Sequence, residues 1–126
     1  MAIGDQHFPA HIVPASASTF NAGQANLTLD PKPPWAKYVR MTVEFESDSV
    51  LVLEYDLSKS GRSQGGSVQR VAGSQNDVNE ILVNLTDVVS PVLTIVSVGY
   101  YERDEEQWAD LTGLSGIIIS NIQYIG

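Results

Sequence analysis

Apolar and polar residues alternate along much of the chain, and this pattern predicts β-strands. From residue 39 to residue 45, apolar side chains at every second position alternate with polar or charged ones, which is typical of a half-buried antiparallel strand. The alternation resumes over 51–57 after a short polar turn, so the two segments predict a β-hairpin. Val50 and Val52 add apolar side chains to the opposite face of the second strand, and residues 81–86 predict another alternating strand.

Two further strands are predicted near the end of the chain. Residues 92–101 are rich in β-branched side chains and are apolar on both faces, which favours a central, well-covered strand. Residues 117–125 predict the last strand. In that strand we expect Ile118, Ile122 and Tyr124 to share one face, because side chains alternate with a period of two.

The connecting segments are polar and short. Residues 58–66 predict a flexible loop, and the acidic residues 102–110 predict a helical turn or a long loop. No segment carries an apolar stripe with the 3.6-residue period of a helix. Seven to eight short antiparallel strands predict an all-β fold with a single β-sandwich. A jelly roll is the favoured arrangement, and an immunoglobulin-like strand order stays open.

The first 24 residues differ from the rest in composition. They are rich in Ala, Ser and Pro, and Pro9 and Pro14 exclude a regular helix. We therefore divide the chain into an extended N-terminal arm at 1–24 and a sandwich domain at 25–126. Four apolar residues are scattered along the arm: Phe8, Ile12, Val13 and Phe20. The arm either lies extended on a protein surface, such as that of a neighbouring subunit, or is a partly ordered tail.

The composition excludes several classes of function. The chain has 126 residues, a net charge of −8 and no cysteine. Its length predicts one domain, because single domains cluster at about 100–150 residues. A sequence without cysteine has no disulfides, thiolate metal sites or cysteine nucleophiles. The acidic balance argues against binding to nucleic acid or to anionic membranes, which requires a basic surface.

The beginning of the chain contains neither the basic nor the apolar segment of a secretory signal. The longest apolar runs are too short to span a bilayer. We therefore expect the protein to be made in a cytoplasm, to remain soluble or assemble there, and not to insert directly into a membrane.

Candidate metal ligands are few and poorly spaced. His7 and His11 have the i, i+4 spacing of a helical metal site, but Pro9 between them excludes the helix. The carboxylates within 102–106 could offer oxygen ligands to Ca²⁺, yet the residue order of an EF-hand loop is missing. We therefore predict no metal and no cofactor, and we interpret the acidic stretch as a solvated loop.

The sequence also lacks catalytic signatures. It contains no G-x-S-x-G nucleophile elbow, and no glycine-rich phosphate loop follows a strand. Several strand carboxylates fall on faces that should lie in water, whereas a glycosidase needs one acid with a raised pKa. They are Glu44, Glu46, Glu54 and Asp56. The sequence therefore predicts a non-enzymatic protein.

Trp35 and Trp108 lie in or beside predicted loops and allow three interpretations. In order of preference, they close the sandwich as core residues, anchor a contact with another subunit, or form a platform on which a sugar ring stacks. A β-sandwich domain that binds carbohydrate, or a receptor-binding head, is therefore the alternative to a structural protein. In that case Trp108→Ala is expected to abolish sugar binding.

The length, the arm and the strand pattern resemble the small jelly-roll penton proteins that close the vertices of tectivirus-like tailless bacteriophages. This resemblance implies a virion structural protein that forms a homopentameric ring and contacts the major capsid and spike proteins. It also implies that the capsid is assembled in the host cytoplasm. A decoration or head protein of a tailed phage would share the same features.

The arm and the loop tryptophans supply the candidate subunit-interface residues for such an assembly. They are Phe8, Ile12, Val13, Phe20, Trp35 and Trp108. A ring forms when one surface of a subunit fits a different surface of its neighbour. Removal of residues 1–20 is expected to leave the sandwich folded and to weaken incorporation into particles.

Overall fold

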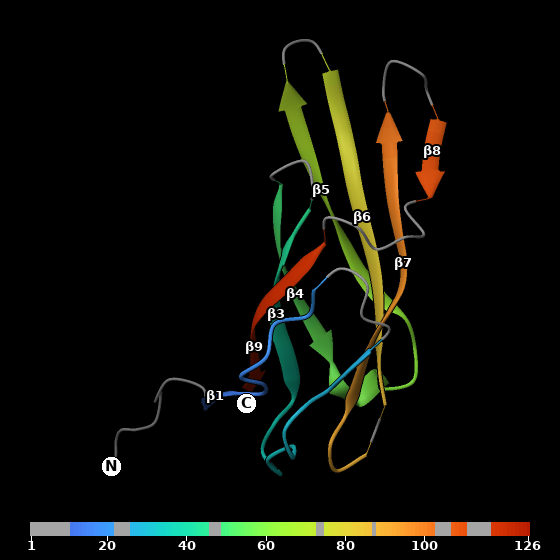
Figure 1. The fold of residues 1–126 in the computed structure, drawn as a ribbon. Coiled ribbons are helices and arrows are strands. Elements are labelled where there is room, and N and C mark those ends of the chain that lie inside the picture. The colour runs from blue at the N-terminus through green and yellow to red at the C-terminus, as the bar shows by residue number, and fades with distance from the viewer. Residues whose placement is uncertain are drawn as a thin grey trace, which may run out of the picture.

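The computed structural model is almost entirely β-structure, and it describes residues 11–21, 26–45, 49–72, 75–86, 88–102, 107–110 and 117–126. Two antiparallel sheets form a sandwich, which confirms the predicted all-β fold (Figure 1). The helical structure within the described ranges is one 3₁₀ turn, η1 (Leu57–Lys59). It follows directly on a strand and leads into the crossing from one sheet to the other.

The first sheet has four strands in the order β1-β9-β3-β4. Their bounds are β1 (Ile12–Pro14), β9 (Ile118–Ile125), β3 (Tyr38–Glu44) and β4 (Val50–Asp56). β3 and β4 form the predicted hairpin, in which Val39 lies opposite Tyr55. The alternating pattern fixes this register, because a slip by one residue would turn every apolar side chain to the other face.

The second sheet contains five strands among the described residues, with β2-β7-β6-β5 in order and β8 paired to β7. Their bounds are β2 (Asn26–Thr28), β7 (Val92–Glu102), β6 (Gln75–Leu85), β5 (Gln64–Ala72) and β8 (Gln107–Asp110). β6 pairs along nearly the whole of β7, so β2 and β8 share the other edge of β7 at its opposite ends. In Figure 1, β5, β6 and β7 extend beyond the four-stranded sheet.

The strand order pairs early strands with late ones in both sheets. β1 pairs with β9 in the first sheet, and β2 pairs with β7 in the second. Pairing of first with last strands is a feature of jelly rolls, in which a folded ribbon wraps into two sheets. The middle of the chain runs as consecutive hairpins, β3-β4 and then β5-β6-β7, with one crossing between the sheets after β4.

Side chains from both sheets fill the space between them. The largest fully buried residues are Tyr55, Tyr124, Phe20, Leu29, Met41, Ile81, Leu85, Leu93, Ile117, Ile119, Val39 and Val43. In β3 and β6 these residues occupy alternate positions, as the sequence pattern predicts. Most of the hydrophobic stabilisation of the fold comes from this layer.

The described part of the predicted arm is joined to the sandwich. Ile12 to Pro14 pair with β9, and the Ala15 amide donates to the Ile122 carbonyl at 2.8 Å. Phe20 is fully buried and forms a β-bridge with Ile119. Because Phe20 belongs to the core, removal of residues 1–20 would take a fully buried side chain from the sandwich, and we expect it to lower the stability of the fold.

A β-bulge in β9 changes which side chains face the core. The pairing with β3 shifts between Arg40 and Thr42, and Asn121 adopts a positive φ of 49°. Asn tolerates this left-handed conformation better than most residues, which suits it to a bulge. The extra residue reverses the alternation, so Ile118 is 39% exposed while Ile122 is buried. The predicted shared face was therefore wrong for Ile118.

Two segments predicted to be loops contain strands. Residues 64–66, placed in the polar loop, begin β5, and residues 107–110, placed in the acidic loop, form β8. At Gly65 a Cβ atom would lie 2.0 Å from the carbonyl oxygen of Ile81 in β6. Glycine is therefore required there, because the two backbones approach too closely for any side chain.

Candidate functional site

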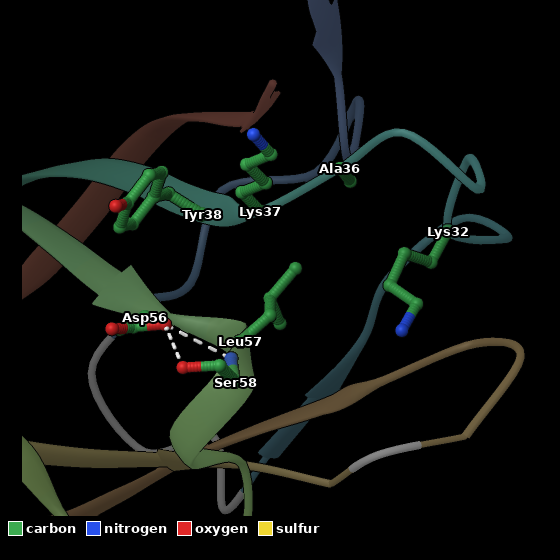
Figure 2. A pocket seen from close by; sticks show the side chains of 7 residues that line it. All are labelled: Lys32, Ala36, Lys37, Tyr38, Asp56, Leu57 and Ser58. Atoms are coloured by element: carbon green, nitrogen blue, oxygen red, sulfur yellow. Dashed lines mark hydrogen bonds between the residues drawn. The ribbon is translucent and has the colours of Figure 1, made fainter.

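A pocket of about 440 Å³ lies where β4 ends and the chain turns into η1. Its lining combines two lysines, a carboxylate, two hydroxyl-bearing residues and two apolar residues. These are Lys32, Lys37, Asp56, Tyr38, Ser58, Ala36 and Leu57. Figure 2 shows Lys32 on one side of the pocket and Asp56, Leu57 and Ser58 on the other.

The proline-rich connection between β2 and β3 positions the lysines. Pro33 accepts a hydrogen bond from the Ala36 amide at 3.1 Å, which closes a turn. The Lys32 amide donates to the Val89 carbonyl at 2.8 Å, and the Lys37 carbonyl accepts from the Leu57 amide at 2.9 Å. The backbone on both sides of the turn is therefore held by neighbouring segments.

Asp56 ends β4 and caps η1. Its Oδ1 atom accepts hydrogen bonds from the Ser58 hydroxyl at 2.7 Å and from the Ser58 amide at 2.9 Å. These bonds, the hydroxyl bond first, lower the pKa of the Asp56 carboxyl, and Lys59 lowers it further. Asp56 is therefore an ionised carboxylate at neutral pH, held in one orientation.

The Gln64 side chain fixes the backbone beneath this carboxylate. Its Oε1 atom accepts from the Asp56 amide at 2.8 Å, and its Nε2 atom donates to the Asp56 carbonyl at 2.9 Å. The side-chain amide thus forms hydrogen bonds with the backbone N–H and C=O groups at the edge of β4, as a neighbouring strand would. Asp56 therefore sits on a rigid element.

A second set of hydrogen bonds holds η1 against β6. The buried Tyr55 hydroxyl donates to the Arg62 carbonyl at 2.7 Å, and the Ser60 hydroxyl donates to the Leu85 carbonyl at 2.8 Å. The wall of the pocket formed by η1 is therefore attached to both sheets.

A second feature is the outer face of the four-stranded sheet, which exposes apolar side chains. Eight large hydrophobic side chains are exposed among the described residues, and five of them lie on this face. They are Ile12, Tyr38, Val50, Val52 and Ile118. An exposed face of an antiparallel sheet is normally polar, and apolar patches mark interaction surfaces. We refer to these five residues as the outer-face patch.

No protein-family model, curated protein or solved structure matches this chain. The pocket and the outer-face patch are therefore interpreted from their own residues. Within the described ranges, no group of three or more histidines and acidic residues could hold a metal ion. Nor does any described helix have the length and apolar character needed to cross a membrane.

The structure separates the predicted interface residues of the arm. Ile12 is 47% exposed on the outer face, Val13 packs against the core, and Phe20 is fully buried within it. Phe8 lies outside the described residues, as does His7. Ile12 is therefore the exposed member of this set among those described.

The two tryptophans lie in different parts of the fold. Trp35 is half-buried, packs against the core and makes an edge-to-face contact with His11, with ring centroids 4.7 Å apart. Trp108 belongs to β8, where it pairs with Tyr101 of β7. The acidic residues 103–106 lie outside the described residues. The structure therefore brings together Trp35 and His11.

The sequence contained a signal for the outer-face patch but not for the pocket. Val50 and Val52 break the alternation of β4 by placing apolar residues on its second face. The pocket combines Lys32 with Ser58, which are far apart in sequence and meet through the strand order. No local pattern could reveal that pairing.

Proposed function

We propose that the protein is a non-enzymatic structural component that assembles with copies of itself through the outer-face patch. The observation that carries this proposal is the concentration of exposed apolar side chains on one sheet face. Val52 is 59% exposed and Val50 is 52% exposed, both on the edge strand β4. Burial of such side chains against a neighbour removes apolar surface from water, which is the main driving force for association.

The outer face has a layout suited to a protein contact. Glu44 of β3 pairs with Val50 on one side and with Ile118 on the other, so an acid lies between two apolar side chains. Further along, Arg40 forms an ion pair with Glu54, with 2.9 Å between Nη2 and Oε2. Charged groups thus lie between the apolar side chains on this face, and such charges favour one partner and one orientation over others.

The free edge of β4 adds a second element. The Phe45 amide donates to Ser49, and the Leu57 amide donates to Lys37, so the odd-numbered residues of this hairpin bond across it. The backbone groups of Val50, Val52 and Glu54 therefore point away from β3. Edge strands with unpaired backbone groups readily pair with another chain.

The more specific proposal is that the protein is a penton protein of the kind that the sequence resembles. Five copies would form a closed ring, in which the outer-face patch meets a different surface of the next subunit. The contacts with the major capsid and spike proteins belong to the same proposal, and so does the location in a virion. The β-sandwich with a joined N-terminal segment agrees with this role but is shared by many other proteins.

Native mass spectrometry and sedimentation of the full chain test both levels of the proposal. A mass of five 13.7 kDa copies supports the penton hypothesis. A dimer or another oligomer supports self-assembly but refutes the pentameric ring. A protein that stays monomeric at every concentration reached refutes self-assembly through this face.

A further inference from the structure

We propose that the pocket beside η1 binds an acidic saccharide, meaning a sugar ring with one carboxylate and adjacent hydroxyl groups. This inference rests on the pocket alone and does not depend on self-assembly. A volume of about 440 Å³ is within the range of small-molecule sites and accommodates one or two sugar rings.

The Lys37 ammonium group provides the recognition of the carboxylate. Lys32 and Lys37 come from the same proline-rich connection and both line the pocket. No described residue forms an ion pair with the Lys37 ammonium group, which points away from Asp56 in Figure 2. It is therefore available to a ligand anion, and its flexible stem allows it to reach one.

The Asp56 carboxylate provides the recognition of hydroxyl groups. Its Oδ1 atom is engaged by Ser58, which fixes the plane of the carboxylate. Among the described residues, no hydrogen-bond donor reaches Oδ2. An ionised carboxylate accepts strong hydrogen bonds, and two adjacent sugar hydroxyls are suitable donors.

Three lining residues provide apolar surface for the ring itself. They are Leu57, Ala36 and Tyr38, of which Tyr38 is 38% exposed. Sugars present a C–H face that packs on such surface, while their hydroxyls bind the polar groups at the edge. The lining therefore matches a ligand that is polar around its edge and apolar on one face.

The balance of charge restricts the ligand further. Lys37, which lines the pocket, has no ion-pair partner among the described residues, so its positive charge is open to a ligand. The net charge of −8 on the whole chain repels polyanions, and the lysines disfavour cations. A ligand with a single carboxylate and several hydroxyls fits this lining better than a phosphate group or a neutral sugar.

Binding of glucuronate, glucose and inorganic phosphate, followed by calorimetry and by amide chemical shifts, tests the assignment. We expect saturable binding of glucuronate, with shifts at the lining residues, and binding of glucose at least about ten-fold weaker, because the ion pairs are lost. Equal affinity for glucose and glucuronate, tighter binding of phosphate, or no binding of glucuronate overturns the proposal.

Paired variants locate the binding. Lys32→Gln/Lys37→Gln is expected to weaken glucuronate binding about ten-fold or more. The control Arg62→Gln/Arg70→Gln removes the same number of positive charges from residues outside the lining and should leave the affinity within about two-fold. Equal losses in both variants would show a general charge effect and refute the site.

Two further variants separate this proposal from others. Lys37→Gln alone should weaken binding even if Lys32 has a structural role. Val50→Lys/Val52→Lys should retain full affinity for glucuronate, because these valines are outside the pocket. Unchanged amide spectra away from the substituted residues confirm that each variant is folded, so a loss of binding reflects the pocket.

Discussion

The replacement of Val50 and Val52 by lysine is the most direct test of the outer-face patch. Their exposed fractions are 52% and 59%, so about half of each side chain remains to be buried by a partner. Full burial of a valine contributes about 1.5–3 kcal/mol, so burial of the exposed half contributes about 1 kcal/mol at each position. The pair therefore contributes about 2 kcal/mol to a contact.

The size of the effect distinguishes two kinds of assembly. In a ring, each contact uses the valines of one copy, and about 2 kcal/mol corresponds to a Kd raised about 30-fold. In a two-fold contact, both copies contribute their valines, and about 4 kcal/mol corresponds to a Kd raised about 1000-fold. Because a lysine ammonium at the contact must also lose water, these values are lower limits.

Sedimentation over a wide concentration range measures the Kd of the wild-type protein and of Val50→Lys/Val52→Lys. The control is Val89→Lys/Val96→Lys, which replaces two valines that are 75% and 49% exposed but lie away from the outer-face patch. We expect the control to retain the wild-type Kd. The reasoning is refuted if both variants dissociate equally, or if Val50→Lys/Val52→Lys associates as strongly as the wild type.

Substitutions at three further positions test the fold. Phe20→Ala is expected to lower the free energy of unfolding by about 3–5 kcal/mol in urea titrations, because the ring is fully buried, and a loss below about 1 kcal/mol would place it outside the core. Asn121→Val should cost about 1–2 kcal/mol at its positive φ, whereas Asn121→Gly should stay within about 0.5 kcal/mol, and equal costs would contradict the bulge. The Tyr124 hydroxyl, which donates to the Asp30 carbonyl, has its pKa raised to about 12 by burial and by the Asp30 charge. Since the folded state favours the protonated hydroxyl, the hydroxyl contributes to the free energy of unfolding. This contribution is complete below about pH 10 and is lost as the pH rises to about 12. Because the hydroxyl lies near the exposed Asp30, we expect the free energy of unfolding in urea titrations to fall by about 1–2 kcal/mol over this pH range. Tyr124→Phe should not show this fall.

The regular strands could be predicted from the sequence because the burial of their side chains alternates from one residue to the next. In β3 and β4, each residue of the pattern faces either the core or the outside, so a period of two is sufficient to find them. The hairpin between these strands needs only a short turn. Local information therefore determines this part of the fold.

The same reasoning failed where one residue changes the register. Asn121 adds a residue to β9, and the alternation that holds before it is reversed after it. The start of β5 was missed because Gly65 has a poor strand propensity, although close approach to Ile81 requires a glycine there. Both features depend on a neighbouring strand, which the sequence of a single strand does not reveal.

The two candidate sites also differ in whether the local sequence reveals them. The valines of β4 could be recognised as an unusual second apolar face from the sequence alone. The pocket depends on the crossing from β4 to β5, which brings Ser58 beside the connection that carries Lys32. Topology is a long-range property, so the pocket could be found only in the structure.

The positions of the two sites allow both proposed roles in one molecule. Val50 begins β4 and Asp56 ends it, and six residues of strand span about 20 Å. Tyr38 belongs both to the outer-face patch and to the pocket lining, so a neighbouring copy leaves the pocket open if it covers the end of the face that carries Val50 and Ile118. Because Gln64 already occupies the edge of β4 at Asp56, strand pairing with a neighbour would stop before it reaches the pocket. An assembled protein could thus present one saccharide site for each copy.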